Sequence, residues 1–248
     1  MSSEKSLALV LRVIEFSETS VIATLFTRDF GKIQGLAKGA RRPKGPFESA
    51  LDLLCLCRLV FLRKSSDALD LLTEAKLERR FRGATRDLSR LYAGYYIAEL
   101  LDSLTDDGDP HPELFDLACE TLVALDSGTS PVAATVLSFE LGAIKLLGHL
   151  PLLEQCVECG TTIESERRVA FGLLAGGVLC PRCRPGKAKV VSLSTAAWEL
   201  MKQPDSPVSQ IDFDRRTYGE VRGVLNQYLS HLLGRRPRMH EYLSILAN

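Results

Sequence analysis

The sequence predicts an α+β protein in which a small N-terminal β-barrel of the OB type precedes an α-helical domain that carries a four-cysteine ribbon. Three observations support this fold class: five strand-like segments before residue 77, a change to helical periodicity after Arg82, and two C-x2-C pairs twenty residues apart. We therefore expect the barrel over residues 1–82 and the helical domain over residues 83–248. The cysteine ribbon should form an insertion at about residues 150–190.

The five expected strands are short segments of alternating or β-branched apolar residues. They cover residues 7–16, 21–27, 32–37, 51–62 and 68–76. Gly31 lies in the tight turn between the second and third strands, where it can adopt a positive φ. The fourth segment is apolar on both faces, as expected of a strand that is covered on both sides. Five such strands, with tight turns and one longer basic connection, are typical of an OB-type barrel.

The helical domain begins where the apolar residues change to a helical spacing. Small polar residues mark four expected helix starts: Thr85, Asp109, Ser130 and Ser194. Pro110 and Pro131 strengthen two of these starts, because proline is favoured at the first position of a helix. The last helix should run from Tyr218 to Leu232 and end at Gly234, since glycine suits the left-handed conformation that follows many helices.

The composition limits the class of protein. Of 248 residues, 46% are hydrophobic and 25% are charged, which is enough apolar material for a real core. No run approaches the ~18 uncharged apolar residues of a membrane span, and the N-terminus lacks the features of a secretory signal. Seven cysteines, an odd number, indicate a reducing compartment rather than a disulfide framework. We expect a soluble, cytoplasmic protein that does not associate with a membrane.

The four cysteines of the C-x2-C pairs are the strongest chemical signal in the chain. They are Cys156, Cys159, Cys180 and Cys183. Each knuckle directs two thiolates toward one point, and four thiolates suit a tetrahedral Zn2+. A redox dithiol is the main alternative, but redox chemistry does not need a second pair. Because four protein ligands leave no open position, we expect one structural zinc ion, and we expect Cys55, Cys57 and Cys119 to be core residues.

The net charge of zero conceals an uneven distribution of charge. Residues 1–84 carry a net charge of +5, residues 85–151 carry −8, and residues 152–248 carry +3. These opposed blocks predict one surface that attracts a polyanion and another that repels it.

The most basic stretch contains six cations within seventeen residues. They are Arg28, Lys32, Lys38, Arg41, Arg42 and Lys44. Cations on a barrel loop can neutralise successive phosphates, so we expect nucleic acid to bind here, whereas a merely solvated loop is the alternative. Phe30 and Phe47 flank the cluster and can stack on bases, although such aromatics more often belong to the core. A second run, Arg235–Arg238, follows the last helix, where the helix C-terminus already favours cations.

The motifs of common enzymes are missing from the sequence. No G-x4-G-K-[ST] or strand-following G-x-G-x-x-G motif occurs, and the four histidines are isolated from cysteines and carboxylates at motif spacing. We therefore expect no catalytic residues and no enzymatic activity.

Several stretches carry a family resemblance. They are Val10–Arg12, Thr24–Arg28, Gly31–Ile33, Ala37–Lys44 and Gly234–Pro237. Together with the order of barrel, helical domain and double C-x2-C motif, they resemble bacterial RecO, the family of recombination-mediator DNA repair proteins, over almost the whole chain. The double C-x2-C motif is shared by only some RecO proteins.

The resemblance implies a function and a set of partners. It implies binding of single- and double-stranded DNA, ATP-independent annealing of complementary strands, and assistance in loading recombinase onto strands coated by single-strand binding protein. It also implies RecR, single-strand binding protein and, in some bacteria, RecF as partners, with a location at the nucleoid. Two other classes fit the residues: a zinc-ribbon transcription or translation factor, which should prefer a nucleic-acid sequence, and a zinc-stabilised enzyme.

Overall fold

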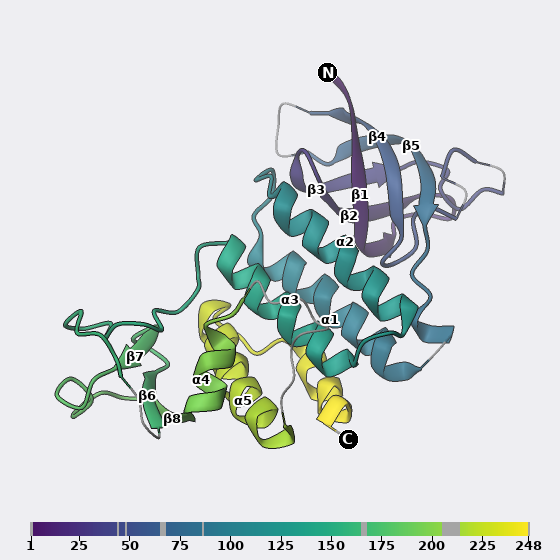
Figure 1. Ribbon diagram of the computed structural model, residues 1–248. Helices are drawn as coiled ribbons and strands as arrows, with labels where there is room; N and C mark the ends of the chain where they lie inside the picture. Colours follow the sequence, from purple (N-terminus) through teal and green to yellow (C-terminus); the bar gives the residue numbers. More distant parts are fainter. Residues whose placement is uncertain are drawn as a thin grey trace. The chain divides into compact units, whose positions relative to one another are not determined.

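The computed structural model describes residues 2–43, 45–47, 49–64, 68–85, 87–164, 168–204 and 214–247 (Figure 1). By their internal contacts, the residues group into two compact units, 1–129 and 130–248. The first unit therefore contains two helices in addition to the strands. The division predicted at residue 82/83 follows the change from strands to helices, and it stays a prediction.

The first unit is built on a closed five-stranded barrel. Its strands are β1 (Ser2–Glu15), β2 (Val21–Thr27), β3 (Gly31–Ala37), β4 (Leu56–Arg63) and β5 (Asp70–Arg79). They follow the order β1-β2-β3-β5-β4, and β4 pairs with β1 to close the ring. All neighbours are antiparallel except β3 and β5, which are parallel. The predicted OB-like barrel and the α+β class are confirmed.

The residues expected to begin the fourth strand form a turn instead. Residues 51–55 precede β4, and Leu54 lies in the left-handed region with φ 64°. The stretch is apolar because Leu54 and Cys55 are buried, Cys55 in the barrel core, together with Phe47 and Ala50 of the same connection. Because these loop residues place apolar side chains in the interior, the segment has the same composition as a strand that is buried on both faces.

The barrel core is formed by inward-facing residues of all five strands. Cys55 and Cys57 are fully buried in it, as predicted, whereas Cys119 is half-buried on a helix. Phe47 is buried and Phe30 packs against the core, with its ring 5.5 Å from that of Phe61. Both flanking aromatic side chains therefore belong to the packing of the barrel core.

Two helices complete the first unit, and each begins later than predicted. Helix α1 (Leu88–Leu104) is capped by Asp87, whose carboxylate accepts the amide of Ser89, whereas Thr85 lies in the short 3-10 helix η1 (Gly83–Thr85). Helix α2 (Pro112–Ser127) has Pro112 in its first turn and His111 at the N-cap. The N-caps predicted at Thr85 and Asp109 are wrong, because a second cap-forming residue, Asp87, follows Thr85 by two positions and a second proline, Pro112, follows Asp109 by three.

Gly31 should be among the least replaceable residues of the barrel. It has φ +68°, and a Cβ built on it would lie 2.2 Å from the carbonyl oxygen of Asp109. We expect Gly31→Ala to lower the free energy of unfolding by about 3 kcal/mol, through left-handed strain and displacement of backbone. Gly39→Ala is the control, because Gly39 has φ +74° but no atom nearer than 3.6 Å. Chemical denaturation measures both, and equal losses would show that the close approach does not matter.

The second unit combines helices with a small sheet. It contains α3 (Val132–Leu146), β6 (Arg168–Gly172), β7 (Gly177–Leu179), β8 (Val190–Ser194), α4 (Thr195–Met201), α5 (Arg215–Leu232) and the 3-10 segment η3 (Arg238–Ala247). The sheet has the order β7-β6-β8 and is antiparallel. Ser194 caps α4 as predicted, and Gly234 follows α5 with φ 66°. The N-cap of α3 is Pro131 rather than Ser130, so that prediction is one residue early.

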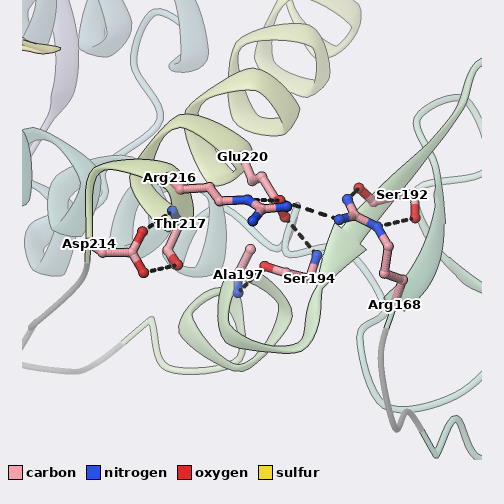
Figure 2. A network of polar contacts seen from close by, with 8 residues as sticks. All are labelled: Arg168, Ser192, Ser194, Ala197, Asp214, Arg216, Thr217 and Glu220. Carbon is pink, nitrogen blue, oxygen red and sulfur yellow. Dashed lines mark hydrogen bonds and ion pairs between the residues drawn. The ribbon is translucent and has the colours of Figure 1, made fainter.

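A polar network joins the sheet of the second unit to α5 (Figure 2). The carboxylate of Glu220 on α5 accepts the backbone amide of Ser194 at 2.7 Å and lies 3.5 Å from a guanidinium nitrogen of Arg168 on β6. Arg168 also donates to Ser192 of β8. Because these bonds cross from strands to helix, they hold the ribbon in a fixed orientation to α5. A further ion pair, between Arg222 and Glu140, is buried and links α5 to α3.

Among the described residues, no helix is both long and apolar enough to cross a membrane.

Candidate metal centre and nucleic-acid interface

The two cysteine pairs meet at one point of the second unit. The sulfur atoms of Cys156, Cys159, Cys180 and Cys183 all lie within 4.8 Å of one another. Tetrahedral coordination with Zn–S bonds of ~2.3 Å places sulfurs about 3.8 Å apart, and Cys159 Sγ lies 3.8 Å from Cys180 Sγ. This pair therefore has the separation of an ideal four-thiolate zinc site, and no other pair of these sulfurs is more than 4.8 Å apart. Four ligands from the protein leave no position for an activated water molecule.

Backbone hydrogen bonds shape both knuckles. In the first, the amide of Gly160 donates to the carbonyl of Cys156 at 2.8 Å, and Gly160 has φ +71°. In the second, the amides of Cys183 and Arg184 donate to the carbonyl of Cys180. The amide of Val157 donates to Val178 on β7, which brings the first knuckle to the strand that leads into the second. The sheet therefore joins pairs that are twenty residues apart in sequence.

Hydrogen-bond donors around two of the sulfurs favour thiolates. Burial by itself would raise the pKa of Cys156, but backbone N–H groups of Cys180, Glu158 and Cys159 lower that pKa to about 6. The hydroxyl and the backbone N–H of Thr161 lower the pKa of Cys159. Thiolates, not thiols, bind metals. The two sulfurs of the first knuckle thus favour the form that a soft divalent cation binds, whereas hydrogen bonds with the sulfurs of Cys180 and Cys159 raise the pKa of Cys183 to about 12.

The connection after β3 presents the central part of the basic segment to solvent. The side chains of Lys38, Arg41 and Arg42 are exposed, and Lys44 lies outside the described residues. Two contacts fix this connection against the β1–β2 turn. The amide of Arg41 donates to the carbonyl of Thr19 at 3.1 Å, and its guanidinium lies 2.9 Å from the carboxylate of Glu15. The connection thus presents exposed cations on a defined backbone.

Arg28 and Lys32 have partners inside the first unit. Arg28 donates two hydrogen bonds to Asp116 of α2, at 3.0 and 2.8 Å, and this pair lowers the pKa of Asp116. The ammonium of Lys32 donates to the carbonyls of Asp102 and Thr105, at the C-terminal end of α1, and its side chain is only 12% exposed. A cation is favoured there because the last carbonyls of a helix lack partners within it. The structure thus buries Lys32 against the end of α1, whereas Arg28, whose side chain is 41% exposed, is paired with a carboxylate on the surface as Arg41 is.

The sequence contained a signal for these two pairings. Residues 85–151 carry a net charge of −8, and the partners of Arg28 and Lys32 come from that acidic block. Sequence reasoning treated the block as a surface that repels DNA. In the structure, part of it neutralises two cations of the barrel.

An exposed aromatic residue escaped the sequence analysis. Phe16 follows β1, and 61% of its surface is accessible, the largest fraction among the exposed large apolar residues of the described ranges. Its surroundings in sequence, Ser17 to Ser20, are polar and typical of a turn. An aromatic residue beside a polar turn was the available signal.

Two family models together cover nearly the whole chain. The model described as Recombination protein O N terminal matches residues 1–81, and the one described as Recombination protein O C terminal matches residues 85–241. The DNA repair protein RecO of Rhodopirellula baltica is 46% identical over 96% of this chain and 97% of its own length. The chain belongs to the RecO family.

Other RecO relatives match at similar coverage. The DNA repair protein RecO of an Anaeromyxobacter species is 36% identical over 96% of this chain and 94% of its own length. That of Moorella thermoacetica is 30% identical over 95% of this chain and 88% of its own length. Because the matches are nearly full-length, the RecO resemblance predicted from the N-terminal motifs is confirmed for both units of the chain.

The C-terminal arginines of this RecO-family chain have partners within the protein. The guanidinium of Arg236 donates to Nδ1 of His240 at 2.7 Å, and Arg235 and Arg238 also make contacts. Their position after α5 agrees with a role at a helix end.

Proposed function

We propose that this RecO-family protein binds single- and double-stranded DNA and anneals complementary strands without ATP. We propose further that it assists the loading of recombinase onto strands coated by single-strand binding protein. The observation that carries the proposal is the exposed cation group on the β3–β4 connection of an OB-type barrel. OB barrels bind nucleic acid with the strand 2–3 face and with the loops between strands 1 and 2 and between strands 4 and 5. The cation group adjoins the first of these loops, because Arg41 is bonded to Thr19 and Glu15 of the β1–β2 turn.

We assign the phosphate contacts to Lys38, Arg41, Arg42 and Lys44. The three described members are solvent-exposed, and arginines grip phosphate with two parallel hydrogen bonds. Arg28 and Lys32, which sequence reasoning placed in the same interface, enter the proposal as residues that hold the barrel to α1 and α2. Their hydrogen bonds to Asp116 and to the end of α1 support this division.

We propose that one Zn2+ is bound by Cys156, Cys159, Cys180 and Cys183. The sulfur spacing and the N–H donors at Cys156 support the assignment. When bound, the ion would cross-link the two knuckles, and it would have no catalytic role because all four ligands come from the protein. We propose no enzymatic activity, and by family membership we propose RecR, single-strand binding protein and RecF as protein partners, in the cytoplasm at the nucleoid.

An annealing assay tests the main proposal. Purified protein, mixed with two complementary oligonucleotides in the absence of nucleotide, should raise the annealing rate well above the spontaneous rate. Cations that neutralise both strands remove the repulsion that slows their pairing. Adding ATP should change nothing. A protein that prefers one duplex sequence and does not accelerate annealing would instead be a transcription or translation factor, and the proposal would be wrong.

A further inference from the structure

The β1–β2 turn holds an aromatic side chain in solvent on an ordered backbone. The amide of Phe16 donates to the carbonyl of Ser20 at 3.0 Å, and the amide of Ser20 donates to the hydroxyl of Ser17 at 3.2 Å. Despite this order, 61% of Phe16 is exposed. Exposing a phenylalanine ring loses the free energy that its burial would supply. This arrangement suits a ring that is covered when a ligand binds.

A row of aliphatic residues crosses the outside of the barrel beside Phe16. Ile14 of β1 is paired in register with Ile22 of β2, which is paired with Leu36 of β3. Ile14 is 43% exposed, and Ile22 and Leu36 are half-buried. Their chain neighbours Val13 and Val21 face the core or pack against it. Since side chains alternate along a strand, Phe16 extends the outward side of β1 beyond Ile14.

Polar and cationic residues lie on both sides of this apolar row. The adjacent row across the same three strands is Arg12, Thr24 and Gln34, and both Arg12 and Gln34 are exposed. On the other side, Arg41 is bonded to Thr19 and Glu15 of the β1–β2 turn. The strip thus has an apolar middle, with the cation Arg12 at one edge and the Arg41–Glu15 ion pair at the other. Unpaired nucleobases attached to a phosphate backbone have the complementary arrangement.

We propose that single-stranded nucleic acid lies across the outer face of β1, β2 and β3, with a base stacked on Phe16. This inference rests on the proposed function, because it names the base contact that accompanies the phosphate contacts. In a duplex, the faces of internal bases are covered by their neighbours, so Phe16 contributes only to single-strand binding. The loop cations contribute to both, since phosphates are exposed in both forms. Phe16 therefore adds affinity for single strands and none for duplex.

The test compares four substitutions of Phe16 on a single strand, an abasic strand of equal length, and a duplex. Phe16→Ala and Phe16→Leu should weaken single-strand binding about fivefold or more, the typical contribution of one stacked base. Phe16→Tyr and Phe16→Trp should keep the wild-type affinity, because they keep an aromatic face. Leu88→Ala is the matched control, since Leu88 is a 60% exposed apolar residue at the start of α1.

The abasic strand and the duplex identify the contact as stacking. Wild-type protein should bind the abasic strand as weakly as Phe16→Ala binds the ordinary single strand. Phe16→Ala should bind the duplex with the affinity and the salt dependence of the wild type. If Phe16→Ala binds single strands like wild type, while substitution of the loop cations still weakens binding, the stacking inference is overturned and the proposed function stands. If substitution of the loop cations has no effect, the proposed interface itself is wrong.

Discussion

Replacing Cys156 by Ser should remove the bound zinc and unfold the ribbon of the second unit. Cys156 is 1% exposed, and it packs with Leu179 and Cys180 in a small apolar cluster around the knuckles. That cluster is too small to hold the two knuckles together without the ion. Structural zinc contributes about 10–16 kcal/mol to the folding of small zinc peptides, so its loss outweighs the local packing.

Metal analysis and limited proteolysis measure this effect. Wild-type protein should contain one zinc per chain and resist cleavage in the ribbon, whereas Cys156→Ser should contain far less zinc and be cut between the knuckles. The barrel of the first unit should survive in both. Cys119→Ser is the control, because Cys119 is a half-buried thiol on α2 outside the cluster, and it should retain both zinc and resistance. A metal-free wild-type protein with an intact ribbon would contradict the assignment.

The sequence predicted elements whose signals are local. β-Branched and aromatic residues located β2, and the turn at Gly31 located the start of β3 to within a residue. Ser194 and Gly234 predicted an N-cap and a helix stop that the structure contains. It failed at residues 51–55, where apolar side chains enter the barrel core from a loop. Periodicity cannot distinguish a loop that fills a core from a strand that is covered on both faces.

The candidate site divides in the same way. Two C-x2-C pairs define their own geometry, because ligand spacing in sequence determines which atoms can meet, and all four sulfurs were predicted correctly to lie together. A basic cluster has no such constraint. The side chain of Lys32 is either exposed to solvent or bonded to the end of α1, depending on a helix seventy residues away in the sequence. Nothing near Lys32 in the sequence specifies that partner.

Replacing Lys38, Arg41, Arg42 and Lys44 together by Ala should remove most of the salt dependence of DNA binding. Each phosphate contact releases counterions, and four contacts on a single strand give a log–log salt slope of about −3. Wild-type affinity should therefore fall about 60-fold between 50 and 200 mM salt. The quadruple variant should lose this slope and bind weakly to all sequences alike, and annealing should fall with it. Its fold should persist, because the three described side chains are exposed.

The control is a second quadruple Ala variant, which removes four positive charges from other positions on the same barrel. Lys5, Arg58, Lys76 and Arg80 are exposed cations on or just after β1, β4 and β5. If attraction to the barrel depended only on its total charge, both quadruple variants would lose the same affinity. If the connection after β3 is the interface, the control should keep nearly the whole salt slope, because long-range attraction is screened within roughly 7–14 Å at these salt concentrations. Equal slopes for wild type and the Lys38–Lys44 variant would place the phosphate contacts elsewhere on the protein.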